Sequence, residues 1–106
     1  MSPYRVAFVT TANAKESERI ASALVTEGLA ACVNIIPGIT SIYRWEGKLE
    51  KDSECKLVIK TREERVEALI ARVVELHSYD VCEVTVLPII AGNPPYLAWI
   101  DDHTQA

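Results

Sequence analysis

Residues 30–61, AACVNIIPGITSIYRWEGKLEKDSECKLVIKT, predict one long β-hairpin in the middle of the chain. The turn falls at 45–48, WEGK, whose glycine supplies the positive φ that a short hairpin loop needs. The residues before the turn are rich in isoleucine and aromatic side chains, which suit a half-buried pleated surface. After the turn, Cys55, Leu57 and Ile59 recur at every second position, as in a strand with one buried face.

This ribbon is too long for a domain of its size. A straight strand from Ala30 to Trp45 would span roughly 50 Å, whereas a compact domain of this length has a diameter of roughly 34 Å. Either the chain bends at Pro37, where a missing ladder donor favours a bulge or an edge position, or the far end projects. A projecting arm would expose Ile42, Tyr43 and Trp45 unless another chain covers them. We therefore expect the arm to be an assembly device.

The bulk composition is that of one soluble globular domain, residues 1–106. Apolar residues make up 49% and charged residues 25%, and the formal net charge is −4 from 15 acidic and 11 basic residues. No basic footprint for nucleic acid is present, no apolar run is long enough to cross a bilayer, and the N-terminus does not read as a signal peptide. Three cysteines without tight spacing favour a reducing, cytoplasmic setting over a disulfide framework or a structural zinc site.

The segment before the ribbon predicts a strand and a helix. Tyr4 to Thr10 alternates like a strand. Asn13 is placed to cap the following helix, with Glu16 three residues later as in a capping box, and Gly28 is placed to end it.

The segment after the ribbon predicts a second helix, a strand and a short final helix. Thr61 is the expected cap of the second helix, with Glu64 completing its box. The last main strand is expected at 83–89, with Pro88 marking an edge or an end. Asn93 is placed to cap a short helix starting at Pro94, followed by a polar tail from residue 101. The second helix carries the clearest amphipathic stripe in the chain, formed by Val66, Leu69, Ile70, Val73, Val74 and His77.

The predicted order is βαββαβ followed by a short helix. This is the split βαβ arrangement of an α+β, ferredoxin-like fold, with both long helices on one face of an antiparallel sheet. The sequence shows no internal repeat beyond the two βαβ halves and no linker.

Four blocks of sequence together resemble the CutA family of divalent-cation tolerance proteins. They are 29–54, LAACVNIIPGITSIYRWEGKLEKDSE; 57–62, LVIKTR; 77–84, HSYDVCEV; and 92–100, GNPPYLAWI. The resemblance implies an intertwined homotrimer of ferredoxin-like subunits in which each ribbon pairs onto a neighbour. It also implies a link to copper and other divalent cations, with no established enzymatic reaction. The family also resembles the PII signalling proteins in fold and trimeric shape, and this likeness is an analogy at the level of the fold.

The chain departs from the family pattern at one place. The family usually has His-Pro-Tyr-Glu where this chain has His-Ser-Tyr-Asp at 77–80. Ser78 loosens the entry to the last strand, and Asp80 keeps a carboxylate with a shorter reach.

The candidate metal ligands are few. Cys32 is by composition a small buried hydrophobe, but the resemblance makes it the best candidate for a copper-linked thiol. Cys55 and Cys82 are expected to pack in the core. His77 either complements the end of the second helix or acts as a ligand or proton-responsive group, and both interpretations stay open. The predicted metal ligands are Cys32, His77, Glu54 and Glu83, taken from a pool that also contains Asp80 and Cys82.

The remaining candidates concern contacts between subunits. Lys60, Tyr79 and Asp80 are expected to line an inter-subunit pocket, and Lys60 is expected to pair with Glu83 because a covered lysine needs a carboxylate. The aromatic side chains of the ribbon and of the short final helix favour packing at an interface between subunits over stacking on nucleic-acid bases. The predicted trimer interface contains Tyr43, Trp45, Tyr96 and Trp99.

The function predicted at this point is a cytoplasmic homotrimer that binds or responds to divalent cations, copper foremost, without catalysis and without an obligatory cofactor. One alternative is a PII-like sensor that binds a small anionic metabolite between subunits through Lys60, His77 and Glu83. Another is a scaffold whose trimer is recognised by a partner protein. An enzyme is a fourth and weaker option.

Overall fold

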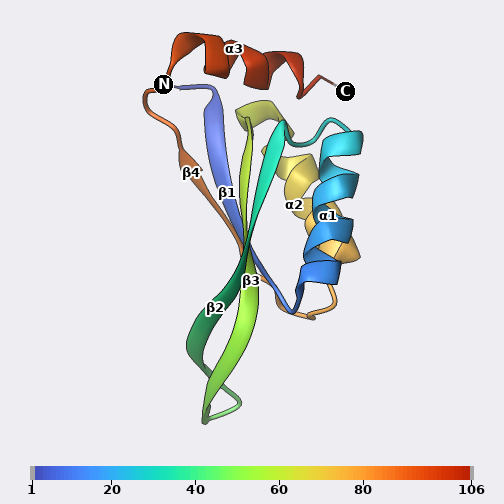
Figure 1. Cartoon of the computed structure of the whole chain (residues 1–106), viewed down its shortest axis with the longest axis vertical. Helices are drawn as coiled ribbons and strands as arrows, with labels where there is room; N and C mark the ends of the chain where they lie inside the picture. The colour runs from blue at the N-terminus through green and yellow to red at the C-terminus, as the bar shows by residue number, and fades with distance from the viewer. Residues whose placement is uncertain (1, 106) are drawn as a thin grey trace.

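Four antiparallel strands form one sheet in the order β2-β3-β1-β4, and two helices cover one of its faces (Figure 1). The computed structural model describes residues 2–105. This arrangement confirms the predicted ferredoxin-like fold, with a third helix, α3, lying across one end of the sheet. The elements are β1 Tyr4–Thr11, α1 Ala14–Thr26, β2 Cys32–Trp45, β3 Lys48–Arg62, η1 Glu63–Arg65, α2 Val66–Leu76, β4 Val84–Pro88 and α3 Pro94–Asp102.

The core lies between the helices and the covered face of the sheet. Alternate residues of β1 and β3 point into it, because successive side chains of a strand face opposite sides. Helix α2 contributes the apolar stripe that the sequence predicts, although its Ile70 and Val74 stay exposed, and α1 contributes Ile20 and Leu24. The fully buried side chains of this layer include Ala7, Val9, Ile20, Leu24, Leu57, Ile59, Leu69 and Val73.

The β2-β3 ribbon extends beyond the rest of the chain (Figure 1). The folded chain measures 45 × 25 × 22 Å, so its long axis exceeds the compact diameter expected for its length. A register shift between Ile36 and Ile39 confirms the predicted bulge at Pro37-Gly38. At the tip, Glu46 and Gly47 have φ of 48° and 79°, as in a two-residue type I′ turn. The ribbon therefore both bends and projects.

Helix α1 begins and ends as the sequence predicts. The Asn13 side chain accepts a hydrogen bond from the Glu16 backbone N–H at 2.8 Å. At the other end Gly28 has a φ of 72°, and the backbone N–H groups of Gly28 and Leu29 donate to Val25 and Leu24, the two bonds of a Schellman motif.

The predicted start of the second helix is wrong. β3 continues to Arg62, and a 3₁₀ turn precedes α2. Thr61 is buried inside the strand, where its hydroxyl donates to the Leu29 carbonyl at 2.7 Å. A local capping pattern was overridden by a tertiary hydrogen bond that ties the turn between α1 and β2 to β3.

The C-terminal segment departs from the prediction in a smaller way. Strand β4 lies at the sheet edge and ends at Pro88, as expected of a residue that cannot donate to a ladder. Asn93 precedes α3 as predicted, but its side chain makes no capping hydrogen bond. The prediction of a polar tail from residue 101 is wrong, because α3 continues to Asp102 and Thr104 is buried. None of the helices within residues 2–105 is long and apolar enough to span a bilayer.

The two asparagine caps give a matched test of the α1 boundary. Asn13→Ala removes a formed capping bond and should lower the free energy of unfolding by about 1 kcal/mol. Asn93→Ala removes no capping bond and should change it far less. Chemical denaturation of both variants at one protein concentration measures the difference, and equal effects would contradict the capping role of Asn13.

Candidate functional site

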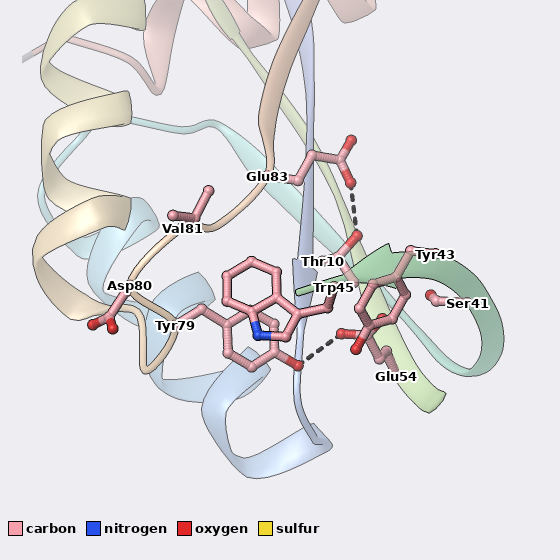
Figure 2. Close-up of a pocket in the computed structure, with 9 residues that line it drawn as sticks. All are labelled: Thr10, Ser41, Tyr43, Trp45, Glu54, Tyr79, Asp80, Val81 and Glu83. Atoms are coloured by element: carbon pink, nitrogen blue, oxygen red, sulfur yellow. Dashed lines mark hydrogen bonds between the residues drawn. The ribbon is translucent and has the colours of Figure 1, made fainter. Parts of the chain in front are cut away.

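A cavity of about 460 Å³ lies where the ribbon leaves the body of the subunit. Its walls come from the end of β1, the two ribbon strands and the loop between α2 and β4, as Figure 2 shows. Its lining combines three aromatic rings with three carboxylates. The lining residues are Thr10, Ser41, Tyr43, Trp45, Glu54, Tyr79, Asp80, Val81 and Glu83.

Glu54 is the most enclosed carboxylate of this cavity, with 7% of its surface exposed. It lies on β3 opposite Ile39, next to the bulge. The Tyr79 hydroxyl donates to its Oε2 at 2.7 Å (Figure 2). Burial, and then this bond to Glu54, raise the pKa of Tyr79, so the phenol remains a neutral donor at physiological pH.

Glu83 occupies the opposite wall and is held by hydroxyl groups. Its Oε1 accepts from the Thr10 hydroxyl at 2.7 Å, and its Oε2 accepts from the Thr85 hydroxyl at 2.7 Å. Asp80 is the third acid of the lining and is exposed. The predicted pair between Lys60 and Glu83 is wrong, because Lys60 donates to Asn34 on β2. The register explains this, since Lys60 lies opposite Val6, four residues along β1 from Thr10.

The ribbon contributes two aromatic rings to the cavity. The Tyr43 hydroxyl donates to the Asp52 carboxylate across the hairpin, and this bond raises the pKa of Tyr43 to about 12. Trp45 immediately precedes the tip turn and is 50% exposed. Its indole lies over the cavity in Figure 2.

His77 lies directly behind the cavity, with its ring centroid 4.7 Å from that of Tyr79. Its Nε2 is 2.7 Å from the Thr10 carbonyl, to which it must donate, and its Nδ1 accepts from the Tyr79 backbone N–H at 3.1 Å. Both ring nitrogens are therefore engaged in the neutral tautomer. His77 ends α2 as the cap residue with an extended backbone, and it positions the 77–83 loop in this arrangement.

Glu16 has a second role that its sequence pattern does not reveal. The sequence predicts it only as part of the capping box at the start of α1. Its side chain is buried, and its two oxygens accept from the backbone N–H groups of Ala12 at 3.0 Å and Ser78 at 2.8 Å. Burial raises the pKa of this carboxyl, but the hydrogen bonds from Ser78 and Ala12 outweigh burial and hold the pKa below its ordinary value. Glu16 thus anchors the cavity loop to the start of α1.

Cys32 lies at the other end of the sheet. It pairs with Lys60, six residues along β3 from Glu54, which is roughly 20 Å away at strand spacing. Cys32 is near Tyr96 of α3, where burial and then the neighbouring thiol raise the pKa of that tyrosine. Tyr96 and Trp99 stack with ring centroids 5.6 Å apart.

The predicted metal ligands therefore do not form one site within a subunit. Glu54 and Glu83 line the cavity, the His77 ring is hydrogen-bonded behind it, and Cys32 is remote. Among residues 2–105, no three histidine, cysteine or acidic side chains are grouped closely enough to hold a metal ion. Cys55 and Cys82 pack against the core as expected, and burial raises the pKa of the Cys82 thiol.

Comparison with known proteins places this architecture in a family. The family model described as CutA1 divalent ion tolerance protein matches residues 5–103. The chain belongs to the CutA1 family. It is 46% identical over 99 residues to the Divalent-cation tolerance protein CutA of Thermus thermophilus, covering 93% of this chain and 96% of that protein.

Other relatives extend the likeness across kingdoms. The chain is 56% identical over 96 residues to the Protein CutA homolog of Xenopus laevis, covering 91% of this chain but 64% of that protein. It spans 56% of the mouse Protein CutA, with 52% identity. The crystal structure of CutA1 from Oryza sativa superposes with a TM-score of 0.95 at 48% identity, covering 98% of this chain and 95% of that one.

The ionised Glu16 carboxylate predicts a pH-dependent contribution to stability. Since its folded pKa lies below the unfolded value of about 4.3, the contribution is fully present above that value and is lost as pH falls through the folded pKa. Glu16→Gln should destabilise the fold at neutral pH, and the gap from wild type should close below about pH 4. Denaturant melts across pH measure it, with the exposed Glu18→Gln as control; a gap that persists at low pH would contradict it.

Proposed function

We propose that this protein assembles as a homotrimer and takes part in divalent-cation tolerance by binding or responding to metal ions, copper foremost, without catalysing a reaction. The observation that carries the proposal is the match of residues 5–103 to the divalent ion tolerance family. The assembly part has independent physical support from surfaces that one subunit leaves uncovered.

The first such surface is the ribbon. Ile42 and Leu49 are 65% and 76% exposed, and Trp45 is half exposed beside them. An apolar two-stranded arm with free edges is stable in water when a second chain covers it. We assign this surface, with Tyr43, to the contact with a neighbouring subunit.

The second surface is the face of the sheet opposite α1 and α2 (Figure 1). The register places Val6, Phe8 and Val58 on this face, because cross-strand partners share a side. Ile36 and Leu87, which are exposed, belong to the same face by register. Three copies that pack these faces together and lay each ribbon on a neighbour would cover both apolar surfaces.

The metal-binding part of the proposal requires ligands from more than one subunit. A single chain does not group three ligands among its described residues, and both ring nitrogens of His77 are engaged. Cys32 lies on the helix-free face, opposite Lys60. An assembly built on that face can complete a thiolate site from neighbouring copies, and thiolate favours Cu(I). All three cysteines are free, in keeping with the reducing, cytoplasmic setting that we propose.

The PII-like alternative has less support. A small anionic metabolite needs cationic or N–H donors, whereas the described residues that line the cavity include Glu54, Asp80 and Glu83 and no lysine or arginine. Lys60, assigned to that role, is engaged by Asn34. The scaffold alternative shares the trimer and differs only in requiring no metal.

The ribbon tip gives the test of assembly. Light scattering of the wild-type protein should return three times the 11.8 kDa mass of one chain. The double variant Trp45→Ala, Leu49→Ala removes apolar area from the arm and should shift the protein to smaller species at low micromolar concentration. Val74→Ala, on α2 and similarly exposed at 53%, is the control and should stay trimeric. A trimer that survives tip truncation would contradict the role of the arm.

The cysteines give the test of metal binding. Cys32→Ser should weaken Cu(I) binding by the reduced protein at least about tenfold in competition with a chelator, since it removes the proposed thiolate. Cys82→Ser, whose thiol is packed against the core, should bind as wild type does. A flat titration of the reduced wild-type trimer would exclude direct copper binding while leaving the assembly intact.

A further inference from the structure

Three carboxylates line the cavity beside the ribbon, and none of them forms an ion pair with another described residue. They are Glu54, Asp80 and Glu83, and the ion pairs among residues 2–105 involve other acids. Glu54 is more than nine-tenths buried, and the Tyr79 hydroxyl is the one hydrogen-bond donor that it receives from the described residues. A carboxylate can accept about four bonds, and a buried charge without a cation is costly. A positive charge from outside the subunit would therefore stabilise the Glu54 carboxylate.

The walls around this carboxylate are aromatic. Tyr43 and Trp45 come from the ribbon and Tyr79 from the α2-β4 loop, and all three surround the same cavity as Glu54 (Figure 2). The faces of such rings attract cations, most strongly for tryptophan and most strongly for weakly hydrated organic ammonium groups. Trp45 retains half of its surface exposed, so it can serve the cavity and still contact a neighbouring subunit.

The same composition is unsuited to a bare metal ion. Divalent metals need several nitrogen, oxygen or sulfur ligands at close range, and the described acids of this cavity are not grouped in that way. An ammonium ion needs one carboxylate and aromatic surfaces, which this cavity offers. Its volume of about 460 Å³ lies within the range of small-molecule sites.

We propose that this cavity binds a small organic ammonium ion, with Glu54 supplying the counter-charge and the rings of Tyr43, Trp45 and Tyr79 enclosing the cationic group. Asp80 and Glu83, the other two acids of the lining, add longer-range attraction for the same charge. This site is separate from the thiolate site proposed at Cys32, roughly 20 Å along the sheet, so either can fail without the other.

Choline and its neutral isostere, in which a tert-butyl group replaces the trimethylammonium group, provide the test. Saturation-transfer NMR on the wild-type trimer should show saturable binding of choline and at least about tenfold weaker binding of the isostere, because only choline gains the carboxylate and cation–π terms. Equal binding of the two compounds would overturn the proposal, since it would reflect apolar contact alone. No saturable binding of choline would also overturn it.

Two variants and one control locate the site. Glu54→Gln removes the charge but keeps the shape and should weaken choline at least about tenfold. Tyr43→Leu, at a partly exposed position, should weaken it several-fold and remains informative if Glu54→Gln does not fold. Glu67→Gln, exposed on α2 and outside the cavity, should bind choline as wild type does.

Unchanged choline affinity in Tyr43→Leu, or in a folded Glu54→Gln, would overturn the assignment to this cavity. The ribbon tip carries Arg44, Lys48 and Lys51, none in an ion pair within the described part of the chain. If one of these side chains from a neighbouring copy fills the cavity, choline binding will be absent in the wild-type trimer, which is the second overturning result above.

Discussion

The pairing of β3 with both β1 and β2 is the constraint on which the rest of this structure depends. β3 is central to the sheet, and its inner half supplies Leu57 and Ile59 to the core while its outer half has only β2 as a partner. One strand thus belongs to a packed domain and to a projecting arm. The bulge at Pro37-Gly38 and the type I′ turn shape the arm without interrupting it.

The cavity exists because this arm leaves the body at a fixed place. Glu54 lies on β3 opposite Ile39, immediately beside the bulge, so it is buried while it lines the same cavity as the aromatic rings of the ribbon. The other wall is a loop, and a loop needs anchors to form a defined surface. Glu16 and His77 provide them through hydrogen bonds to the loop backbone and to β1. The buried polar network therefore sets the shape of the cavity, while the carboxylates that line it set its charge.

Most residues of the candidate site could be predicted from the sequence, but which of them come together in the fold could not. Tyr43, Trp45, Glu54, Tyr79, Asp80 and Glu83 were all singled out, and the structure brings these six to one cavity. Cys32 and Lys60 were assigned with them but lie at the other end of the sheet. Single-sequence reasoning can rank side chains by chemistry, whereas their separation depends on strand register, which a one-residue slip would change completely.

The sequence by itself determined the order of elements, the caps at Asn13 and Gly28, the hairpin turn and the length of the arm, because each follows from local backbone chemistry or from counting residues. Tertiary structure alone decided that Thr61 remains in a strand, that Lys60 bonds to Asn34 rather than Glu83, and that Glu16 holds a distant loop. These outcomes depend on which buried polar groups meet across the sheet. No local pattern encodes that pairing, since it is fixed only when the strands take their register.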